Sequence, residues 1–93
     1  MFKTNEYFEG KVKSVAYENE MGKYTIGVMA DGDYEFGTGS NEEMTVVNGT
    51  LVALLPGENE WKTYSAGTTF HVAADVKFKV KAIGTTSYLC RYY

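Results

Sequence analysis

The stretch EEMTVVNGTLVALLPG, residues 42–57, decides the fold class of this chain. It predicts a strand over residues 43–47, a two-residue hairpin turn at Asn48-Gly49, and a continuously apolar strand over residues 51–55. Pro56-Gly57 then closes the apolar run as a further turn. Short β-branched and apolar runs that alternate with turn residues are typical of antiparallel sheets. The stretch therefore predicts an all-β protein.

The remainder of the chain has the same pattern of short runs and turns. Asp31-Gly32 matches a second two-residue hairpin turn, because Gly tolerates the positive φ of a type I′ turn. No window has a period of 3.6, and glycines interrupt every candidate for a long helix. Eight or nine short strands bury their apolar faces only as two packed sheets or as a closed barrel. We therefore expect one domain over residues 1–93, a β-barrel or jelly roll, with further strands over residues 11–17, 24–29, 34–36, 61–64, 68–72, 78–82 and 85–93.

The composition excludes several classes of protein. A hydrophobic share of 44% and an aromatic share of 15% exclude disorder by composition. One His and one Cys can build neither a closed tetrahedral zinc site nor a disulfide framework. A nucleophilic pair is arithmetically possible only as His71 with Cys90. Alternation places His71 on the face opposite Phe70, and no basic neighbour is evident to activate Cys90, so we expect neither to be catalytic.

The charge pattern bears on partners and location. The net charge is −3 and no basic run is present, so nucleic acid is not an expected partner. Lys77, Lys79 and Lys81 share one face of a strand, where solvated lysines are ordinary. No apolar stretch is long enough for a signal peptide or a membrane span. A single unpaired Cys fits a reducing compartment, so we expect a cytoplasmic protein without a membrane partner.

Two segments resemble the motifs of the cupins. Residues 42–49 have the Glu, six residues and Gly that end the first cupin motif, and residues 66–78, AGTTFHVAADVKF, follow the layout of the second. The His-x-His that precedes this Glu in metal-binding cupins falls in residues 35–38, where no His is present. The metal-binding His of the second motif falls at or near Phe78. The resemblance implies a cupin-like β-barrel without the metal site.

A closer resemblance runs essentially from end to end. NEYFEGKVKS (residues 5–14), EEMTVVNG with its downstream LLP, and TSYLCRYY (residues 86–93) resemble the pyrimidine/purine nucleoside phosphorylase family. This resemblance implies a phosphorolysis, in which a purine or pyrimidine nucleoside and phosphate give the free base and ribose 1-phosphate. It also implies that phosphate is the co-substrate, that no metal or other cofactor is needed, and that the protein is a homodimer.

Phosphorolysis needs an anion site for the phosphate and polar groups for the ribose. Glu42 and Glu43 are the candidate catalytic carboxylates, of which only one can face inward from an extended strand. Glu42 is the first choice, because metal-bearing cupins point the Glu at this position into the barrel. Arg91 is the candidate catalytic phosphate ligand, with Lys13 and Ser87 as helpers. The alternative for Arg91, which shares its strand face with Leu89 and Tyr93, is a surface ion pair. The alternatives for Lys13 and Ser87 are a solvated lysine and a serine that ends a turn.

The base needs an apolar or stacking wall. Aromatic side chains could supply it, and stacking suits broad base specificity because every base has a π-face. Phe78 should line the pocket because it occupies the vacated ligand position, and Tyr88 could add a hydroxyl for the base or the ribose. The alternative for each is ordinary core packing. The candidates for substrate binding are Phe36, Phe78, Tyr88 and Trp61.

Two other functions remain open at this point. A non-catalytic cupin that binds a small ligand, such as a sugar or a nucleotide, would need the same pocket and no metal. A metal-dependent oxygenase or isomerase is disfavoured, because one His and a carboxylate are too few for a two-His-one-carboxylate site.

Overall fold

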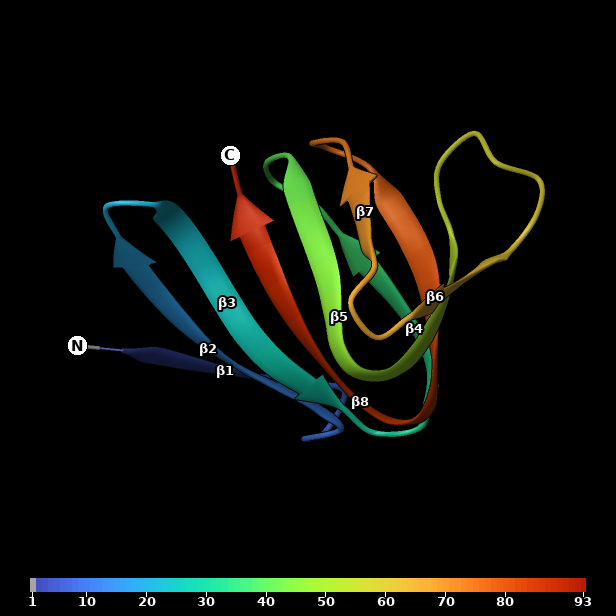
Figure 1. Ribbon diagram of the computed structural model, residues 1–93, viewed down its shortest axis with the longest axis horizontal. Helices are drawn as coiled ribbons and strands as arrows, with labels where there is room; N and C mark the ends of the chain where they lie inside the picture. Colours follow the sequence, from blue (N-terminus) through green and yellow to red (C-terminus); the bar gives the residue numbers. More distant parts are fainter. Residues whose placement is uncertain (1) are drawn as a thin grey trace.

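The computed structural model describes residues 2–93, in which all regular elements are β-strands (Figure 1). The all-β prediction is thereby confirmed. No helix in residues 2–93 is long and apolar enough to cross a membrane. These residues form eight strands, namely β1 (Lys3–Tyr7), β2 (Val12–Asn19), β3 (Gly22–Met29), β4 (Gly32–Gly37), β5 (Glu42–Leu54), β6 (Lys62–Ser65), β7 (Thr69–Val72) and β8 (Lys77–Tyr92).

Two long strands, β5 and β8, organise the sheet. They pair antiparallel along most of their lengths, and the strand order is β1-β2-β3-β8-β5-β6, with β4 on β8 and β7 on β5. The first part of β8, residues 77–82, pairs with β4, and its last part, residues 86–92, pairs with β3. In the same way β5 pairs first with β7 and then with β6. Both strands therefore belong to two halves of the molecule, and they curve from one half to the other (Figure 1).

The predicted hairpin at Asn48-Gly49 is wrong, because these residues form a β-bulge inside β5. The register of β5 against β8 shifts on both sides of Asn48. Gly49 has a φ of +100°, and a Cβ atom there would lie 2.5 Å from the Thr86 hydroxyl oxygen. That hydroxyl donates to the Thr50 carbonyl and accepts from the Thr50 N–H, both at 3.2 Å. The turn-forming residues bend one strand instead of joining two, because the chain on both sides pairs with β8.

The predicted hairpin at Asp31-Gly32 is also wrong. β3 pairs with β2 and β8, whereas β4 crosses to the other end of β8. The Asp31 carboxylate accepts a hydrogen bond from the Gly84 N–H at 2.7 Å, which ties this crossing to the bend of β8. Two strands predicted over residues 78–82 and 85–93 are parts of the single strand β8. No strand was predicted for residues 3–7, which form β1.

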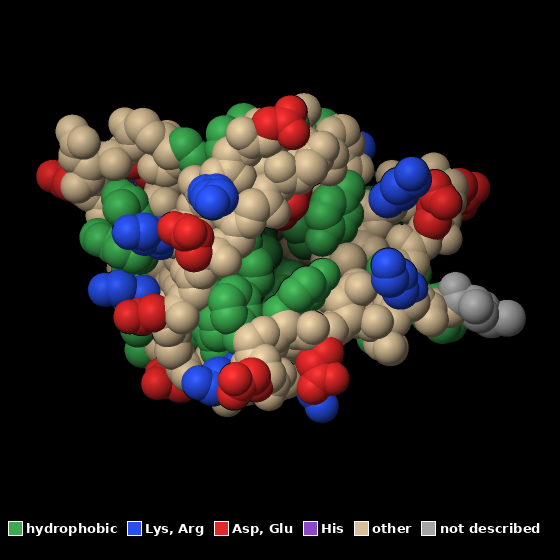
Figure 2. Space-filling model, turned by 180° about the vertical axis from the view of Figure 1, so that it is seen from behind, with side chains coloured by type: hydrophobic (Ala, Val, Ile, Leu, Met, Phe, Trp, Pro, Cys, Tyr) green, Lys and Arg blue, Asp and Glu red, His purple; other side chains and the backbone are tan. Residues whose placement is uncertain are grey.

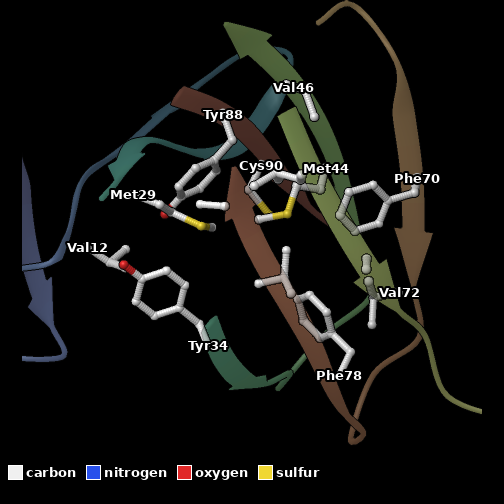
Figure 3. Packing of buried hydrophobic residues seen from close by; sticks show 14 residues of the cluster. Val12, Met29, Tyr34, Met44, Val46, Phe70, Val72, Phe78, Tyr88 and Cys90 are labelled. Carbon is white, nitrogen blue, oxygen red and sulfur yellow. The ribbon is translucent and has the colours of Figure 1, made fainter. Parts of the chain in front are cut away.

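The core lies between the inner faces of the two halves. In Figure 3, Met29 and Tyr88 lie on one side, and Phe70, Val72 and Phe78 lie on the other. Alternate residues of each strand face inward, as the period of two requires. The buried hydrophobic cluster consists of Val12, Met29, Tyr34, Met44, Val46, Leu51, Ala53, Phe70, Val72, Phe78, Val80, Ala82, Tyr88 and Cys90.

The inner face of β3 has a gap that the Tyr88 ring fills. Gly27 is paired with Tyr88 across β3 and β8. A Cβ atom at Gly27 would lie 2.5 Å from both the ring carbon Cζ and the hydroxyl oxygen of Tyr88. The tyrosine therefore packs against bare backbone, and any side chain at residue 27 displaces it.

We expect Gly27→Ala to destabilise the protein by about 1–3 kcal/mol, because the Tyr88 ring must move within a packed core. Urea-induced unfolding measures the change in the free energy of unfolding. Gly39→Ala is the matched control, since no heavy atom lies within 4 Å of a Cβ atom at Gly39. The control should change stability by less than about 0.5 kcal/mol. Equal losses in the two variants would contradict the proposed steric cause.

Candidate active site

A cavity of about 410 Å³ opens between the inner faces of the two halves. Six strands and the β1–β2 turn contribute to its lining. The lining residues are Tyr7, Phe8, Ser14, Met29, Glu35, Phe36, Gly37, Glu42, Met44, Phe78, Tyr88 and Tyr92. Four of the residues predicted for the site, Glu42, Phe36, Phe78 and Tyr88, therefore lie together in one cavity.

Glu42 is the member of the adjacent carboxylate pair that faces inward. It begins β5, paired with Val72 of β7 on one side and with Tyr92 of β8 on the other. The Cys90 thiol donates a hydrogen bond to its Oε1 at 3.4 Å. Burial raises the pKa of Glu42, and the bond from Cys90 offsets part of this rise. The carboxyl group is therefore held in a partly desolvated position with one weak donor beside it.

Two tyrosine hydroxyls lie on the same inner face of β8. Burial, the largest cause, raises the pKa of Tyr88 to about 12, and a hydrogen bond with Ser14 opposes this rise. The Tyr92 hydroxyl lies 2.9 Å from Thr25 Oγ1, and burial raises the Tyr92 pKa as well. Both hydroxyls keep their protons at neutral pH and can donate hydrogen bonds to a ligand.

Cys90 lies between the two tyrosines along β8 and does not have the character of a nucleophile. Burial, followed by the nearby charge of Glu42, raises the pKa of its thiol. The thiol is buried and stays neutral, as expected from the sequence. Its function in the structure is to pack and to donate to Glu42.

Aromatic rings form the other side of the lining. Phe36 of β4 is paired with Phe78 of β8, and their ring centroids are 5.9 Å apart. Phe8 packs edge-to-face on Phe36, with centroids 5.5 Å apart. On the face shown in Figure 2, hydrophobic side chains gather in a central hollow with charged side chains around it. The cavity thus combines an aromatic wall with a group of polar side chains.

Arg91 and Glu43 lie on the outer face of the sheet, because each is adjacent to an inward-facing residue. Arg91 Nη1 lies 4.0 Å from Glu43 Oε2, and His71 Nε2 lies 3.3 Å from the same oxygen. The Arg91 guanidinium also lies over the Tyr93 ring, 5.2 Å from its centroid. The structure therefore does not bring Arg91 or Glu43 together with Glu42. His71 faces outward, as expected.

Three further predicted residues also lie outside the cavity. Lys13 and Ser87 line a separate groove on the outer face, of about 680 Å³, formed mainly by β1, β2 and β3. Trp61 is exposed, and the Lys81 ammonium lies 4.4 Å from the centroid of its ring. No Lys or Arg side chain is part of the lining of the inner cavity in residues 2–93.

Several lining residues were not predicted from the sequence, among them Tyr7, Phe8, Ser14, Glu35 and Tyr92. Tyr92 could have been found, since it shares the alternation of Tyr88 along one strand. Ser14 required the knowledge that β2 lies opposite β3. No sequence pattern placed Phe8, which lies in a turn.

The donor set does not fit the metal site found in metal-binding cupins. Among residues 2–93, no three His, Cys, Asp or Glu side chains are grouped so that they could hold a metal ion. Phe78, at the position where metal-binding cupins have a His ligand, lies in the cavity, and His71 points outward.

Comparisons with known proteins agree in family and fold. A family model described as pyrimidine/purine nucleoside phosphorylase matches residues 2–92. A protein of that name from Pseudoalteromonas atlantica is 55% identical over 92 residues, which cover 99% of each chain. A crystal structure from Vibrio parahaemolyticus has a TM-score of 0.95 at 42% identity, covering 100% of this chain and 99% of that one. An RmlC-like cupin from Shewanella frigidimarina has a TM-score of 0.76 at 15% identity, covering 99% of this chain and 83% of that one, which confirms the cupin-like fold.

The raised pKa of Glu42 predicts a pH-dependent effect of Glu42→Gln on stability. Because the folded pKa lies above the unfolded one, this carboxyl group stabilises the fold fully below the unfolded pKa. That contribution is lost as the pH rises through the folded pKa. We therefore expect Glu42→Gln to gain stability relative to the unmodified protein as the pH rises above the ordinary glutamate value of 4.5.

Urea unfolding at a series of pH values measures this difference. Glu43→Gln is the control, because it removes one negative charge from the outer face of the same strand. The same pH trend in both variants would assign the effect to net charge and contradict the explanation by burial.

Proposed function

The chain belongs to the pyrimidine/purine nucleoside phosphorylase family, and we propose that it catalyses the metal-independent phosphorolysis of both purine and pyrimidine nucleosides. The products are the free base and ribose 1-phosphate. The observation that carries the proposal is the lining of the inner cavity, with aromatic rings on one side and a carboxyl group and hydroxyls on the other. A nucleoside has the same division, an aromatic base joined to a hydroxyl-bearing sugar.

Glu42 is proposed as the catalytic carboxylate. When the bond between the base and C1′ breaks, the ribose develops positive charge, which a nearby carboxylate stabilises. The same group can accept hydrogen bonds from the ribose hydroxyls, because its one donor within residues 2–93 is a thiol. Its partial burial strengthens both interactions, since charges interact more strongly away from water.

Phe36, Phe78 and Tyr88 are proposed as contacts of the substrate. Stacking on Phe36 and Phe78 supports broad base specificity, because a ring face accepts purines and pyrimidines alike. The Tyr88 hydroxyl, whose pKa of about 12 keeps it protonated, is proposed to donate a hydrogen bond to the base or the ribose. Trp61 lies outside the cavity and has no part in this arrangement.

Of the parts of the reaction, phosphate binding has the fewest candidate ligands within one chain. Arg91 is proposed as its ligand on chemical grounds, since a planar guanidinium binds phosphate oxygens in pairs. It lies on the outer face beside Glu43, and Lys13 and Ser87 lie on that face too. Arg91 therefore has to reach the phosphate by a movement of its side chain or from a second copy of the chain.

A homodimer formed through the outer face is proposed as the assembly, and the cytoplasm as its location. Ile26 and Val28 of β3 and Val47 of β5 expose 46%, 48% and 51% of their surface, respectively. Apolar side chains grouped in this way on a sheet face support an interface with another protein surface. The single free cysteine, Cys90, supports a reducing compartment.

A second function is favoured by one observation. The inner cavity has the carboxylate of Glu42 in its lining and no Lys or Arg in the described residues. A cavity of this charge suits a neutral ligand better than a phosphate dianion. A non-catalytic protein that binds a sugar or a nucleoside is therefore the alternative.

Incubation of the pure protein with uridine or adenosine, phosphate and EDTA tests the proposal. We expect release of the free base and ribose 1-phosphate, and a fall in kcat/KM of about 100-fold in Glu42→Gln, which cannot carry the stabilising charge. Glu43→Gln should lose less, because its side chain faces outward. A nucleoside that raises the melting temperature without being consumed would establish the binding function instead.

The same assay tests the role of Arg91. We expect Arg91→Ala to raise the KM for phosphate while the KM for the nucleoside changes little. Lys77→Ala removes an exposed positive charge at the opposite end of β8 and controls for net charge. Unchanged phosphate kinetics in Arg91→Ala would reject Arg91 as the phosphate ligand.

Sedimentation velocity tests the homodimer. We expect twice the chain mass of 10.4 kDa for the unmodified protein. Val28→Asp places a charge among the exposed apolar side chains and should shift the population to monomers. A monomer mass for the unmodified protein at micromolar concentration would refute the assembly.

A further inference from the structure

The turn between β1 and β2 has an unfavourable backbone conformation. Phe8, Glu9 and Gly10 have consecutive φ values of +53°, +57° and +87°. Hydrogen bonds from the Gly10 N–H to the Tyr7 carbonyl and from the Lys11 N–H to the Phe8 carbonyl close it, at 3.1 and 3.2 Å. Gly accepts a left-handed φ without penalty, but an aromatic residue does not. The conformation of Phe8 therefore needs support from the contacts of its side chain.

The Phe8 ring lies at the open end of the aromatic wall. Its centroid is 5.0 Å from that of Tyr34 and 5.5 Å from that of Phe36, with an interplanar angle of 89° to Phe36. Phe8 exposes 43% of its surface, whereas Phe78 on the far side of Phe36 exposes 2%. The rings of Phe8, Phe36 and Phe78 thus run from the solvent-exposed part of the cavity to its closed end.

Packing alone is a weak reason for this arrangement. The ring packs on those of Tyr34 and Phe36 but leaves much of its apolar surface exposed, so its burial stabilises the fold less than that of a core residue. Strained residues of this kind persist where neighbouring contacts hold them, and they are frequent at ligand clamps. Phe8 is one of the residues that line the cavity.

We propose that Phe8 is a specificity-determining residue that stacks on the nucleobase at the entrance of the cavity and favours purines. This inference rests on the proposed function. The polar group around Glu42 and Tyr88 then receives the sugar, and the base lies toward the rings of Phe36 and Phe8. A purine has two fused rings, so it covers more of the exposed Phe8 surface than a pyrimidine does.

Two substitutions separate the ring from the backbone of Phe8. Phe8→Asn removes the ring but suits the left-handed conformation, because Asn tolerates positive φ. Phe8→Tyr keeps the ring. We expect Phe8→Asn to raise the KM for adenosine about tenfold more than that for uridine, and Phe8→Tyr to stay within about twofold of the unmodified protein. The values of kcat should change little, since the reacting atoms lie away from the ring.

An unchanged ratio of the two KM values in Phe8→Asn would overturn the proposal. Calorimetric titration with adenosine in the absence of phosphate provides a readout that does not need catalysis. If the protein binds adenosine but has no phosphorolytic activity, the proposed reaction fails and the stacking role is still decided by the affinity of Phe8→Asn. If the unmodified protein binds no adenosine, or Phe8→Asn binds it equally well, the stacking role is rejected. Equal melting temperatures of the variants confirm that the fold is intact.

Discussion

The antiparallel pairing of β5 with β8 determines where Glu42, Tyr88 and Arg91 lie. Both strands run through both halves of the molecule, and their alternate residues define the inside and the outside. The register that pairs Met44 with Cys90 places Glu42 inside and Arg91 outside. A shift of one residue would exchange the two faces of a strand, and the cavity would lose its carboxylate to the solvent. The bulge at Asn48 and the bend at Gly84 let the two strands curve without disturbing this register at the site.

The inner face tolerates polar groups because almost all of them are neutral. Tyr88 and Tyr92 keep their protons, and each has a hydroxyl partner, Ser14 or Thr25. Glu42 is the exception, and its raised pKa reflects the loss of water around the carboxylate. A thiol is too weak a donor to satisfy a carboxylate fully. Glu42 is therefore the inner group with the most to gain from a ligand that donates hydrogen bonds.

Local patterns predicted the strands well but not their partners. Alternation along TSYLCRYY places Cys90 inside and Arg91 outside, as the structure has them, whereas the expectation of a common site came from chemistry and resemblance. The turn residues at Asn48-Gly49 and Asp31-Gly32 satisfied every local criterion for a hairpin. They were misassigned because pairing with β8, far along the chain, decides whether a Gly bends a strand or ends it. Phe8 could not be predicted, since its place depends on a left-handed turn and on contacts with β4.

The separation of charge across the sheet shapes the chemistry of the cavity. The Glu42 carboxylate inside favours a sugar that becomes positive as its base departs, and it opposes the approach of a phosphate dianion. The Arg91 guanidinium, which could offset the repulsion between this carboxylate and phosphate, lies on the outer face beside Glu43 and Tyr93. The inner hydroxyls are neutral donors that can hold phosphate oxygens without a full positive charge. A phosphorolytic reaction in this fold must therefore either recruit the outer cation or rely on oriented neutral donors, and the strength of its phosphate binding distinguishes the two.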